Sequence, residues 1–492
     1  MAYTSIAMPA LRVILAILIL FPLAIGPWYL GSYYNEYRWP LIYATWIAVA
    51  ASLFLSPRGH TPHRRITKWL PLLLVTLIVT QGLWMLNNTW GEFIENEVIG
   101  TRHYFWEIIS LDNQPYPTLP GTVDKKEAAD RLSYIIPALL YFTVLHLKLA
   151  SRSIKLSTLC ATIFWIGVSI AFLGLAQRFT DAPGFYWNEE LYDRHRPLFF
   201  ATFRSPGIAA CYLNLCLTMG LSYLLATSHR LRRKKHAKPT LPICISIGVV
   251  ILTTAAMSAG SKAGTIFTVI TILLWLLTNL RSIWKLLHQS TALLPSGSPH
   301  ERNIIISSVL ATMIFAVVSF GGVFHERWNR ALDSDFGSLT HRHIANHCML
   351  TMLEENHPKF SNWGALGYGP GSFMPMFPFF THDKAGALNS KWIYAHNDPL
   401  QTLIEWGWLG TSFWILLIAG SAFLLLYEQL AKRKKQSRTH LFYFNGATIG
   451  MFIFLLHSTV DFPFQIESIA ISFAAVLSIG WAAPSLRRHS RQ

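Results

Sequence analysis

Charged residues are scarce in this chain, and their scarcity excludes a soluble protein of this size. Only 13% of the 492 residues are Asp, Glu, Lys or Arg, whereas 52% are hydrophobic, and the mean hydropathy is +0.35. Apolar runs near or above the length needed to cross ~30 Å of hydrocarbon recur from one end to the other. We therefore expect an all-α polytopic membrane protein.

Cysteine is also sparse, and its positions argue against a disulfide framework or a zinc site. The spacing of the five cysteines is typical neither of a disulfide framework nor of a zinc site. Four of them fall in apolar runs, where cysteine acts as a small apolar residue. The chain shows no fixed-period repeat. A cleavable signal peptide is not indicated, because Pro27-Trp28-Tyr29 follows the apolar run 13–25 where small cleavage-site residues belong. We expect this run to be the first span.

The apolar runs divide the chain into about twelve spans and three regions. The predicted spans are 11–30, 40–55, 69–86, 133–149, 156–176, 206–227, 241–257, 264–280, 304–323, 399–427, 442–460 and 466–483. Residues 1–323 would hold the first nine spans, 324–398 one large loop, and 399–492 the last three spans.

Positive charge is concentrated on one side of this topology. Twelve spans put both termini on the same side, called side A, which has a net charge of about +23 against about −7 on side B, together giving the +16 of the chain. The positive-inside rule makes side A cytoplasmic. The clearest basic clusters are 230–235 and 432–435, which we interpret as topology signals beside anionic headgroups. The basic charge therefore requires no nucleic acid as a partner.

Three loops on side B are long, namely 87–132, 177–205 and 324–398. The third is rich in aromatic residues, Pro and Gly. Long loops without regular structure tend to be functional. A catalytic function would accordingly lie on the extracytoplasmic face of the membrane.

The segment from Ala395 to Gly410 places a histidine, an amide and a carboxylate at the mouth of a span. Asp398 followed by Pro399 is typical of a helix N-cap and first turn, and Gln401 can complete a capping box. Capping does not explain His396, which precedes the helix. A titratable imidazole at this position is a candidate for proton chemistry on a lipid-borne substrate.

Two glycine features accompany this histidine. Gly407 and Gly410 would let a neighbouring helix approach closely. The segment 364–373, which contains Gly369 and Gly371, can expose backbone N–H groups, but it matches neither a P-loop nor a dinucleotide turn. It could cradle a phosphate or form a tight turn beneath the site.

Candidate cations lie in two other places. Arg342 begins a helix-like stretch and could clamp a diphosphate with its guanidinium fork, with Arg327 and Arg330 as rivals. His343 and His347 have the i, i+4 spacing of a metal pair, but no third ligand is evident, so we expect no metal site.

Lys262 stands in a short polar break between two apolar runs, where a lysine is costly unless it faces water, a partner or an anion. The small residues around it favour a buried, anion-facing role over snorkelling to the interface. His457 and Asp461, one turn apart between the final spans, either pair with each other or support the site.

These residues together resemble the superfamily of O-antigen ligases and of O-antigen and exopolysaccharide polymerases of bacterial envelopes. Its Ser-Arg-Gly/Ala element resembles Ser261-Lys262-Ala263, its arginine opening a periplasmic helix resembles Arg342, and its Gly-x-Gly-x-Gly-x-Phe turn resembles 367–373. Its His-Asn-x-x-Leu-Gln…Glu-x-Gly-x-x-Gly signature resembles 396–410, which adds Asn397, Gln401 and Glu405 to the supporting residues. Lys262 departs from the usual arginine, and Asn346 from a common aromatic.

The resemblance implies an inverting glycosyltransferase of the periplasmic face that uses neither a metal nor a cofactor. The donor would be a glycan on undecaprenyl diphosphate, and the acceptor a hydroxyl on another glycan, on lipid A-core or on a protein. Lys262 and Arg342 would stabilise the diphosphate charge, and His396 would remove the acceptor proton. Asp398 and Asp461, with Gly369 and Gly371, would support them.

Two other functions remain open from the sequence. A protein O-oligosaccharyltransferase of the same superfamily differs only in its acceptor, for which we find no distinct motif. A secondary transporter also suits twelve spans with both ends inside, although the two related halves common in transporters are not evident.

Overall fold

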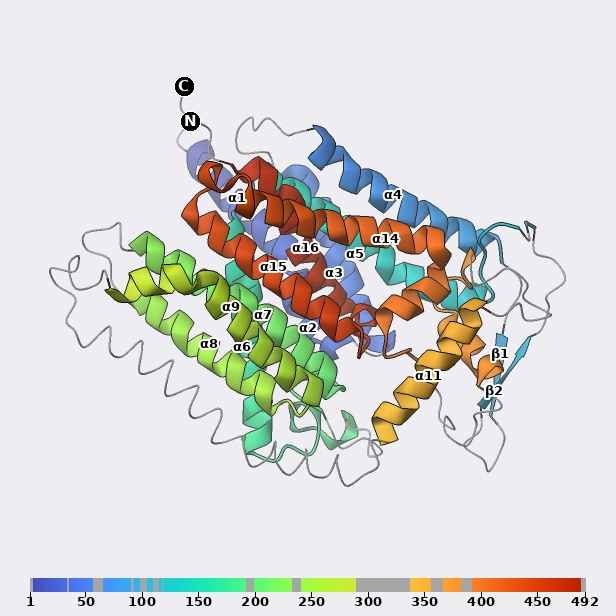
Figure 1. The fold of residues 1–492 in the computed structure, drawn as a ribbon. Helices are drawn as coiled ribbons and strands as arrows, with labels where there is room; N and C mark the ends of the chain where they lie inside the picture. Colours follow the sequence, from blue (N-terminus) through green and yellow to red (C-terminus); the bar gives the residue numbers. More distant parts are fainter. Residues whose placement is uncertain are drawn as a thin grey trace.

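The computed structural model shows a helical bundle whose long helices lie roughly along one direction (Figure 1). It describes residues 3–32, 35–55, 65–89, 93–97, 104–108, 115–116, 118–191, 199–231, 240–288, 337–354, 366–381 and 392–487. The helices of the first half are α1 (Tyr3–Leu20), α2 (Pro22–Trp28), α3 (Asn35–Phe54), α4 (Arg65–Asn87), α5 (Lys125–Ala150), α6 (Leu156–Phe179) and α7 (Pro206–Leu231). Those of the second half are α8 (Thr240–Ser258), α9 (Lys262–His288), α11 (Gly337–Glu354), α13 (Phe373–Met376), α14 (Asp398–Leu430), α15 (Arg438–Ser458) and α16 (Glu467–Ala482).

These helices confirm the predicted fold class. Every predicted span within the described residues coincides with a helix, and ten helical segments there are long and apolar enough to cross a membrane. The span predicted at 40–55 forms α3, which is not among the ten because aromatic residues and Arg38 lower its hydropathy. The span predicted at 304–323 lies outside the described residues, as do Arg327 and Arg330.

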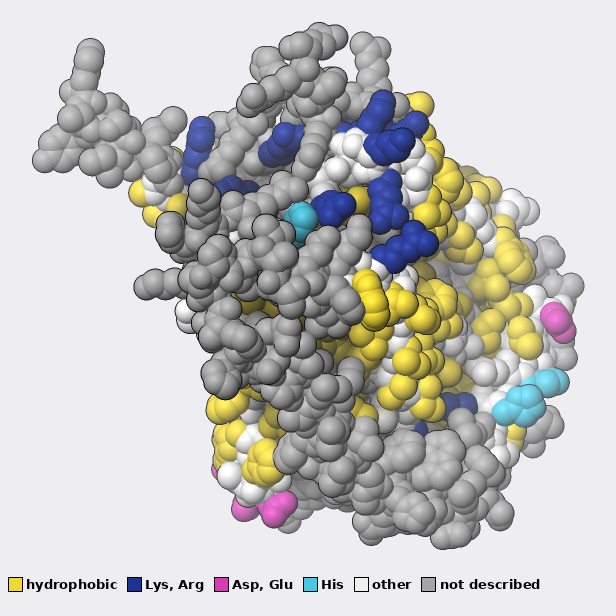
Figure 2. All heavy atoms as spheres, turned by 60° about the vertical axis from the view of Figure 1, so that its left-hand side comes forward, with side chains coloured by type: hydrophobic (Ala, Val, Ile, Leu, Met, Phe, Trp, Pro, Cys, Tyr) yellow, Lys and Arg dark blue, Asp and Glu magenta, His cyan; other side chains and the backbone are white. Residues whose placement is uncertain are grey.

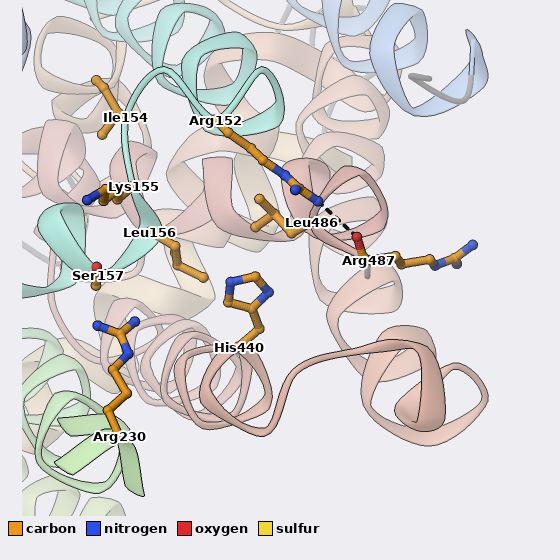
Figure 3. Close-up of a pocket in the computed structure, with 9 residues that line it drawn as sticks. All are labelled: Arg152, Ile154, Lys155, Leu156, Ser157, Arg230, His440, Leu486 and Arg487. Atoms are coloured by element: carbon orange, nitrogen blue, oxygen red, sulfur yellow. Dashed lines mark hydrogen bonds between the residues drawn. The ribbon is translucent and has the colours of Figure 1, made fainter. Parts of the chain in front are cut away.

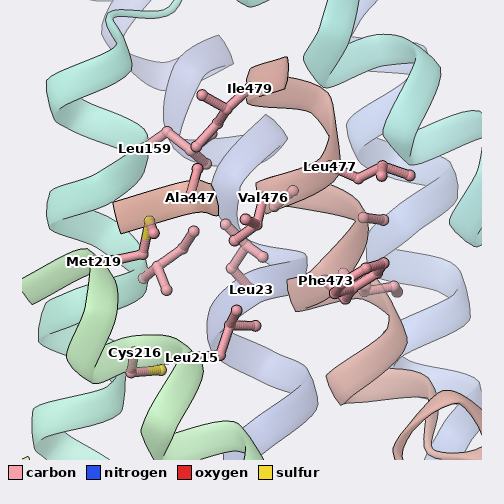
Figure 4. Close-up of a cluster of buried hydrophobic side chains, with 14 of the residues drawn as sticks. Leu23, Leu159, Leu215, Cys216, Met219, Ala447, Phe473, Val476, Leu477 and Ile479 are labelled. Carbon is pink, nitrogen blue, oxygen red and sulfur yellow. The ribbon is translucent and has the colours of Figure 1, made fainter. Parts of the chain in front are cut away.

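The core of the bundle is formed by α7 and α16, because 89% of the apolar window of each is buried. Leucine, alanine, phenylalanine and cysteine side chains from α2, α6, α7, α15 and α16 interdigitate there (Figure 4). Small residues permit this close packing: a side chain at Gly220 would meet Phe164, and one at Gly446 would meet Ser222.

The loops predicted for side A meet at one end of the bundle. Lys148 donates a hydrogen bond to the carbonyl oxygen of Leu55 at 2.8 Å, and Arg152 donates one to that of Arg487 at 2.9 Å. Glu428 pairs with Arg487 at the same end. Figure 2 shows Lys and Arg side chains gathered at this end beside a broad hydrophobic surface, and Figure 1 places both chain termini there.

The loops predicted for side B meet at the opposite end, where α11 lies (Figure 1). Arg38, at the start of α3, forms ion pairs with Asp130 at 2.5 Å and with Glu467 at 2.9 Å. The structure also contains a two-stranded β-hairpin in one of these loops, which the sequence did not predict. The strands β1 (Phe93–Glu97) and β2 (Tyr104–Ile108) pair antiparallel, in keeping with their aromatic residues.

Helix α14 is broken at Gly407, whose φ of 63° and ψ of −175° are not helical. The break frees consecutive carbonyl groups of the preceding turn, and other segments take them up. The amides of Tyr368 and Gly369 donate to the carbonyls of Ile404 and Glu405 at 2.8 and 2.9 Å, and the Gln81 side chain of α4 donates to the next carbonyl at 3.0 Å. Freed backbone groups must be satisfied in this way within a membrane.

The glycine-rich turn at 367–373 therefore takes the second of the two roles considered from the sequence, a tight turn beneath the site. Its amides at Tyr368 and Gly369 donate hydrogen bonds to carbonyl groups of α14. Gly367, Gly369 and Gly371 have φ of 89°, 99° and 79°, a left-handed backbone that other residues adopt at a cost. A Cβ on Gly369 would also lie 2.6 Å from the backbone of Thr122.

Replacement of Gly369 by alanine is expected to destabilise the fold by about 2–5 kcal/mol, because backbone strain adds to overpacking. Thermal unfolding of the purified protein measures this loss. Gly184→Ala is the control, because the extended backbone of Gly184, with φ of −171°, is open to any residue. Equal stability of the two variants would contradict the role given to the turn.

Candidate active site

The candidate site is built around the start of α14, and its cap differs from the prediction by one residue. Asn397, not Asp398, is the N-cap, and its side chain accepts a hydrogen bond from the Leu400 amide at 3.3 Å. The buried Asp398 instead accepts from the Phe464 amide at 2.9 Å and from the Gln465 side chain at 3.0 Å. Asp398 therefore fastens α14 to the segment between α15 and α16.

Gln401 is not the capping-box partner that its spacing predicted. Its side-chain oxygen accepts from the Ala395 amide at 3.0 Å, and its amide nitrogen donates to Glu405 at 3.0 Å. The backbone amides of Gly371 and Phe373 also lie near the Glu405 carboxylate and stabilise its charged form. These contacts join the glycine turn, α14 and the residue before His396, so they fix where His396 stands.

His396 itself has a left-handed backbone, with φ of 52°. Residues other than glycine adopt this conformation at a cost, and such residues cluster at functional sites, although seven other described residues of this chain also have positive φ. The edge-on rings of Trp392 and Phe462, at 5.8 and 4.7 Å between centroids, hold the imidazole. The side chain remains 32% exposed, so the imidazole is both fixed and accessible.

Two charged groups face Nδ1 of this imidazole. The Asp461 carboxylate lies 3.3 Å from Nδ1, and the Arg342 guanidinium lies 3.5 Å from it. A carboxylate can accept a hydrogen bond from an Nδ1–H group, whereas a guanidinium can only donate a hydrogen bond. The pair with Asp461 therefore favours the tautomer with hydrogen on Nδ1, which leaves the lone pair on Nε2. Within the described residues, no hydrogen bond occupies Nε2.

Asp461 is placed to remain ionised. Burial alone would raise the pKa of its carboxyl, but the hydrogen bond with His396 and the charges of His396, His457 and Arg342 outweigh burial, so its pKa lies below the usual value. Its second oxygen lies 4.0 Å from Nε2 of the buried His457. Both roles that the sequence left open are thus present: Asp461 faces His457 and also contacts His396.

Arg342 reaches the site from α11. It donates a hydrogen bond to the Val460 carbonyl at 2.7 Å, next to Asp461 in the chain. One turn further along, Asn346 accepts from Asn397 at 3.4 Å. Cys348 and Met352 of α11 lie in a second buried cluster with the glycine turn, and Ile344 packs against this cluster.

The burial predicted for Lys262 is wrong, because its side chain is exposed at the first residue of α9. No contact in the described structure joins it to Arg342 or His396. Its neighbour Ser261 does lie close to the site: a Cβ built on Gly207 would be 2.0 Å from Asp461 Oδ2 and 3.7 Å from Ser261 Oγ. Lys262 thus begins its helix beside the Asp461 carboxylate, with its side chain directed outward.

Sequence reasoning missed Arg131, a buried residue near the start of α5. Arg131 donates a hydrogen bond to Gln465 at 3.1 Å, which in turn holds Asp398, and it lies over the Tyr394 ring at 5.1 Å from the centroid. In the sequence Arg131 stands among charged residues at the end of the predicted loop 87–132, so no signal distinguished it. The exposed His343 and His347 take no part in these contacts.

One comparison with known proteins found a match, over a part of the chain that carries several of the candidate site residues. Residues 247–415 match the O-antigen ligase family, a range that includes Lys262, Arg342, the glycine turn and His396. The chain matches no curated protein sequence. The match supports a glycan-transferring enzyme of the ligase or polymerase type, embedded in the membrane of a bacterial envelope by many helices. The O-antigen ligase domain matched at residues 247–415 thus supports the O-antigen ligase superfamily as the family of this part of the chain.

Proposed function

We propose that the protein transfers a glycan from undecaprenyl diphosphate to an acceptor hydroxyl on the periplasmic face of the cytoplasmic membrane. The observation that carries this proposal is the position of the His396 Nδ1 atom between Asp461 and Arg342. A base and a fixed cation side by side suit a reaction in which a proton is lost and a diphosphate leaves.

The reaction is a single displacement at the anomeric carbon. The acceptor oxygen attacks C1 of the donor glycan, the C1–O bond to the diphosphate breaks, and the acceptor proton passes to His396 Nε2. Undecaprenyl diphosphate leaves with the electron pair of the broken bond, and the configuration at C1 inverts. Arg342 stabilises the charge that develops on the leaving oxygen, and no step requires a metal ion.

Asp461 acts through His396. An ionised Asp461 accepts the Nδ1 proton and so keeps Nε2 free to take the acceptor proton. Lys262 lies beside the same centre, and we assign its exposed ammonium to the diphosphate as it arrives from the lipid phase. The orientation follows from charge: the basic end of the bundle faces the cytoplasm with both termini, and the candidate site faces the periplasm.

Replacement of Asp461 by asparagine is expected to lower kcat about 10- to 100-fold, as is typical when the partner that orients a histidine is lost. The asparagine NH2 group would donate to Nδ1 and move the proton to Nε2, which then cannot act as a base. Steady-state kinetics should show an unchanged KM for the donor, and thermal unfolding should show a folded variant. A normal kcat would exclude Asp461 from this role.

The acceptor class is tested in a strain that lacks the protein. Analysis of its lipid-linked glycans is expected to show one of two accumulated donors. A single repeat unit indicates a lost polymerase, whereas finished polymer indicates a lost ligase. A strain whose lipid-linked glycans and surface glycans are both unchanged would contradict the proposed function.

A further inference from the structure

A basic cavity opens at the end of the bundle opposite the candidate active site. Its volume is about 460 Å³, which lies within the range of ligand sites. It lies between the start of α6, the end of α7, the start of α15 and the segment after α16 (Figure 3). Its cationic and titratable lining residues are Arg152, Lys155, Arg230, His440 and Arg487.

The positive charge of this cavity is largely uncompensated. No carboxylate lines it, and the nearby Glu428 is engaged by Arg487, through both of its oxygens, and by the side chain of Gln436. Within the described residues, Arg152, Lys155 and Arg230 form no ion pair. The Nε atom of Arg152 is buried there without a hydrogen-bond partner. Cations held together in this way repel one another unless an anion lies between them.

The start of α6 adds to the attraction for an anion. Lys155, Leu156 and Ser157 form its N-cap and first two residues and line the cavity. No side chain caps this helix end, so its first amides and the helix dipole are available to a negative group. The remaining lining is apolar, with Ile154, Leu156 and Leu486, which suits a ligand that joins a charged group to hydrocarbon.

We propose that this cavity binds a phosphate group on a small organic molecule. Two sources share this chemistry: the phosphodiester headgroup of an anionic membrane lipid, and a soluble phosphate ester. The site is separate from the candidate active site, because α7 (26 residues) and α15 (21 residues) each run from one to the other, a distance of about 30 Å or more at 1.5 Å per residue.

Binding to the purified full-length protein in an uncharged detergent tests this proposal. The probes are short-chain phosphatidylglycerol, glycerol 3-phosphate and short-chain phosphatidylcholine. The variant Lys155→Gln/Arg230→Gln removes two exposed cations of the cavity. The matched control Arg433→Gln/Lys434→Gln removes two exposed cations of the same basic end that do not line it.

Phosphatidylglycerol is expected to bind the wild-type protein more tightly than phosphatidylcholine does. The cavity variant should lose about 10- to 30-fold in affinity, as expected for two cations near a membrane surface, and the control should remain within about twofold. Binding of phosphatidylglycerol alone identifies a lipid source, whereas equal binding of glycerol 3-phosphate identifies a soluble one. Absence of binding by both, or equal loss in the two variants, would overturn the proposal.

Discussion

Replacement of His396 by alanine is expected to abolish glycan transfer to the cell surface. A positioned general base contributes ~10²–10⁴ to a rate, and His396 is a partly exposed base whose Nδ1 atom lies within 3.5 Å of both Arg342 and Asp461. The measurement is surface glycan in a deletion strain that carries the variant, together with the amount of variant protein in the membrane.

His347→Ala is the matched control for this experiment. His347 is an exposed histidine of α11, near Arg342 in sequence, and it makes no side-chain contact with the site. Its replacement should leave transfer unchanged. Normal surface glycan in cells that make the His396 variant at wild-type levels would remove His396 from the mechanism.

Replacement of Arg342 by glutamine is expected to lower kcat about 10²–10³-fold, the loss typical of a fixed group that stabilises developing charge. The NH2 group of Arg342 lies 3.5 Å from His396 Nδ1, while its NH1 group is held by the Val460 carbonyl at 2.7 Å. The guanidinium is thus positioned before substrate arrives. Arg342→Lys should recover part of the rate, because it keeps the charge and loses the fork.

The control for Arg342 is His343→Gln, an exposed polar position on the next residue of α11. Kinetics with a purified lipid-linked donor separate the two ways in which an arginine can act. A fall in kcat places the contact in the transition state, whereas a rise in KM alone would mean that Arg342 holds substrate and transition state equally. An unaltered kcat/KM would exclude Arg342 from the site.

The sequence predicted the helices well because span length and hydropathy are local properties. The alternation of the predicted spans likewise predicted which loops meet, since described loops of side A make contacts at one end and those of side B at the other. The β1–β2 hairpin was missed because its strands have only five residues each and stand in a long loop, although Gly100 between them is a turn residue.

The site residues were predicted less evenly. His396, Arg342 and Asp461 meet as expected, although they are separated by 54 and 65 positions in the chain. The roles of Asp398 and Gln401 were assigned from helix-capping patterns, whereas the structure gives both residues partners outside those patterns. Local spacing cannot reveal such long-range partners.

The break of α14 at Gly407 is another feature that local residue spacing could not fully reveal. Glycine spacing correctly indicated close packing, since Gln81 of α4 reaches the backbone beside it. It did not indicate a left-handed residue inside the helix, nor that the glycine turn would take up the freed carbonyls. Lys262 was placed in the interior because small residues surround it, yet its side chain extends outward from the start of α9.

Glycan transfer by the purified protein in lipid vesicles tests the central claim most directly. The donor is a glycan on undecaprenyl diphosphate, the acceptor is the lipid or glycan that the deletion strain identifies, and the product is measured over time. The wild-type protein should form product without added metal, and the folded His396→Ala protein should form less than about one hundredth as much. Equal product from both proteins would contradict the mechanism.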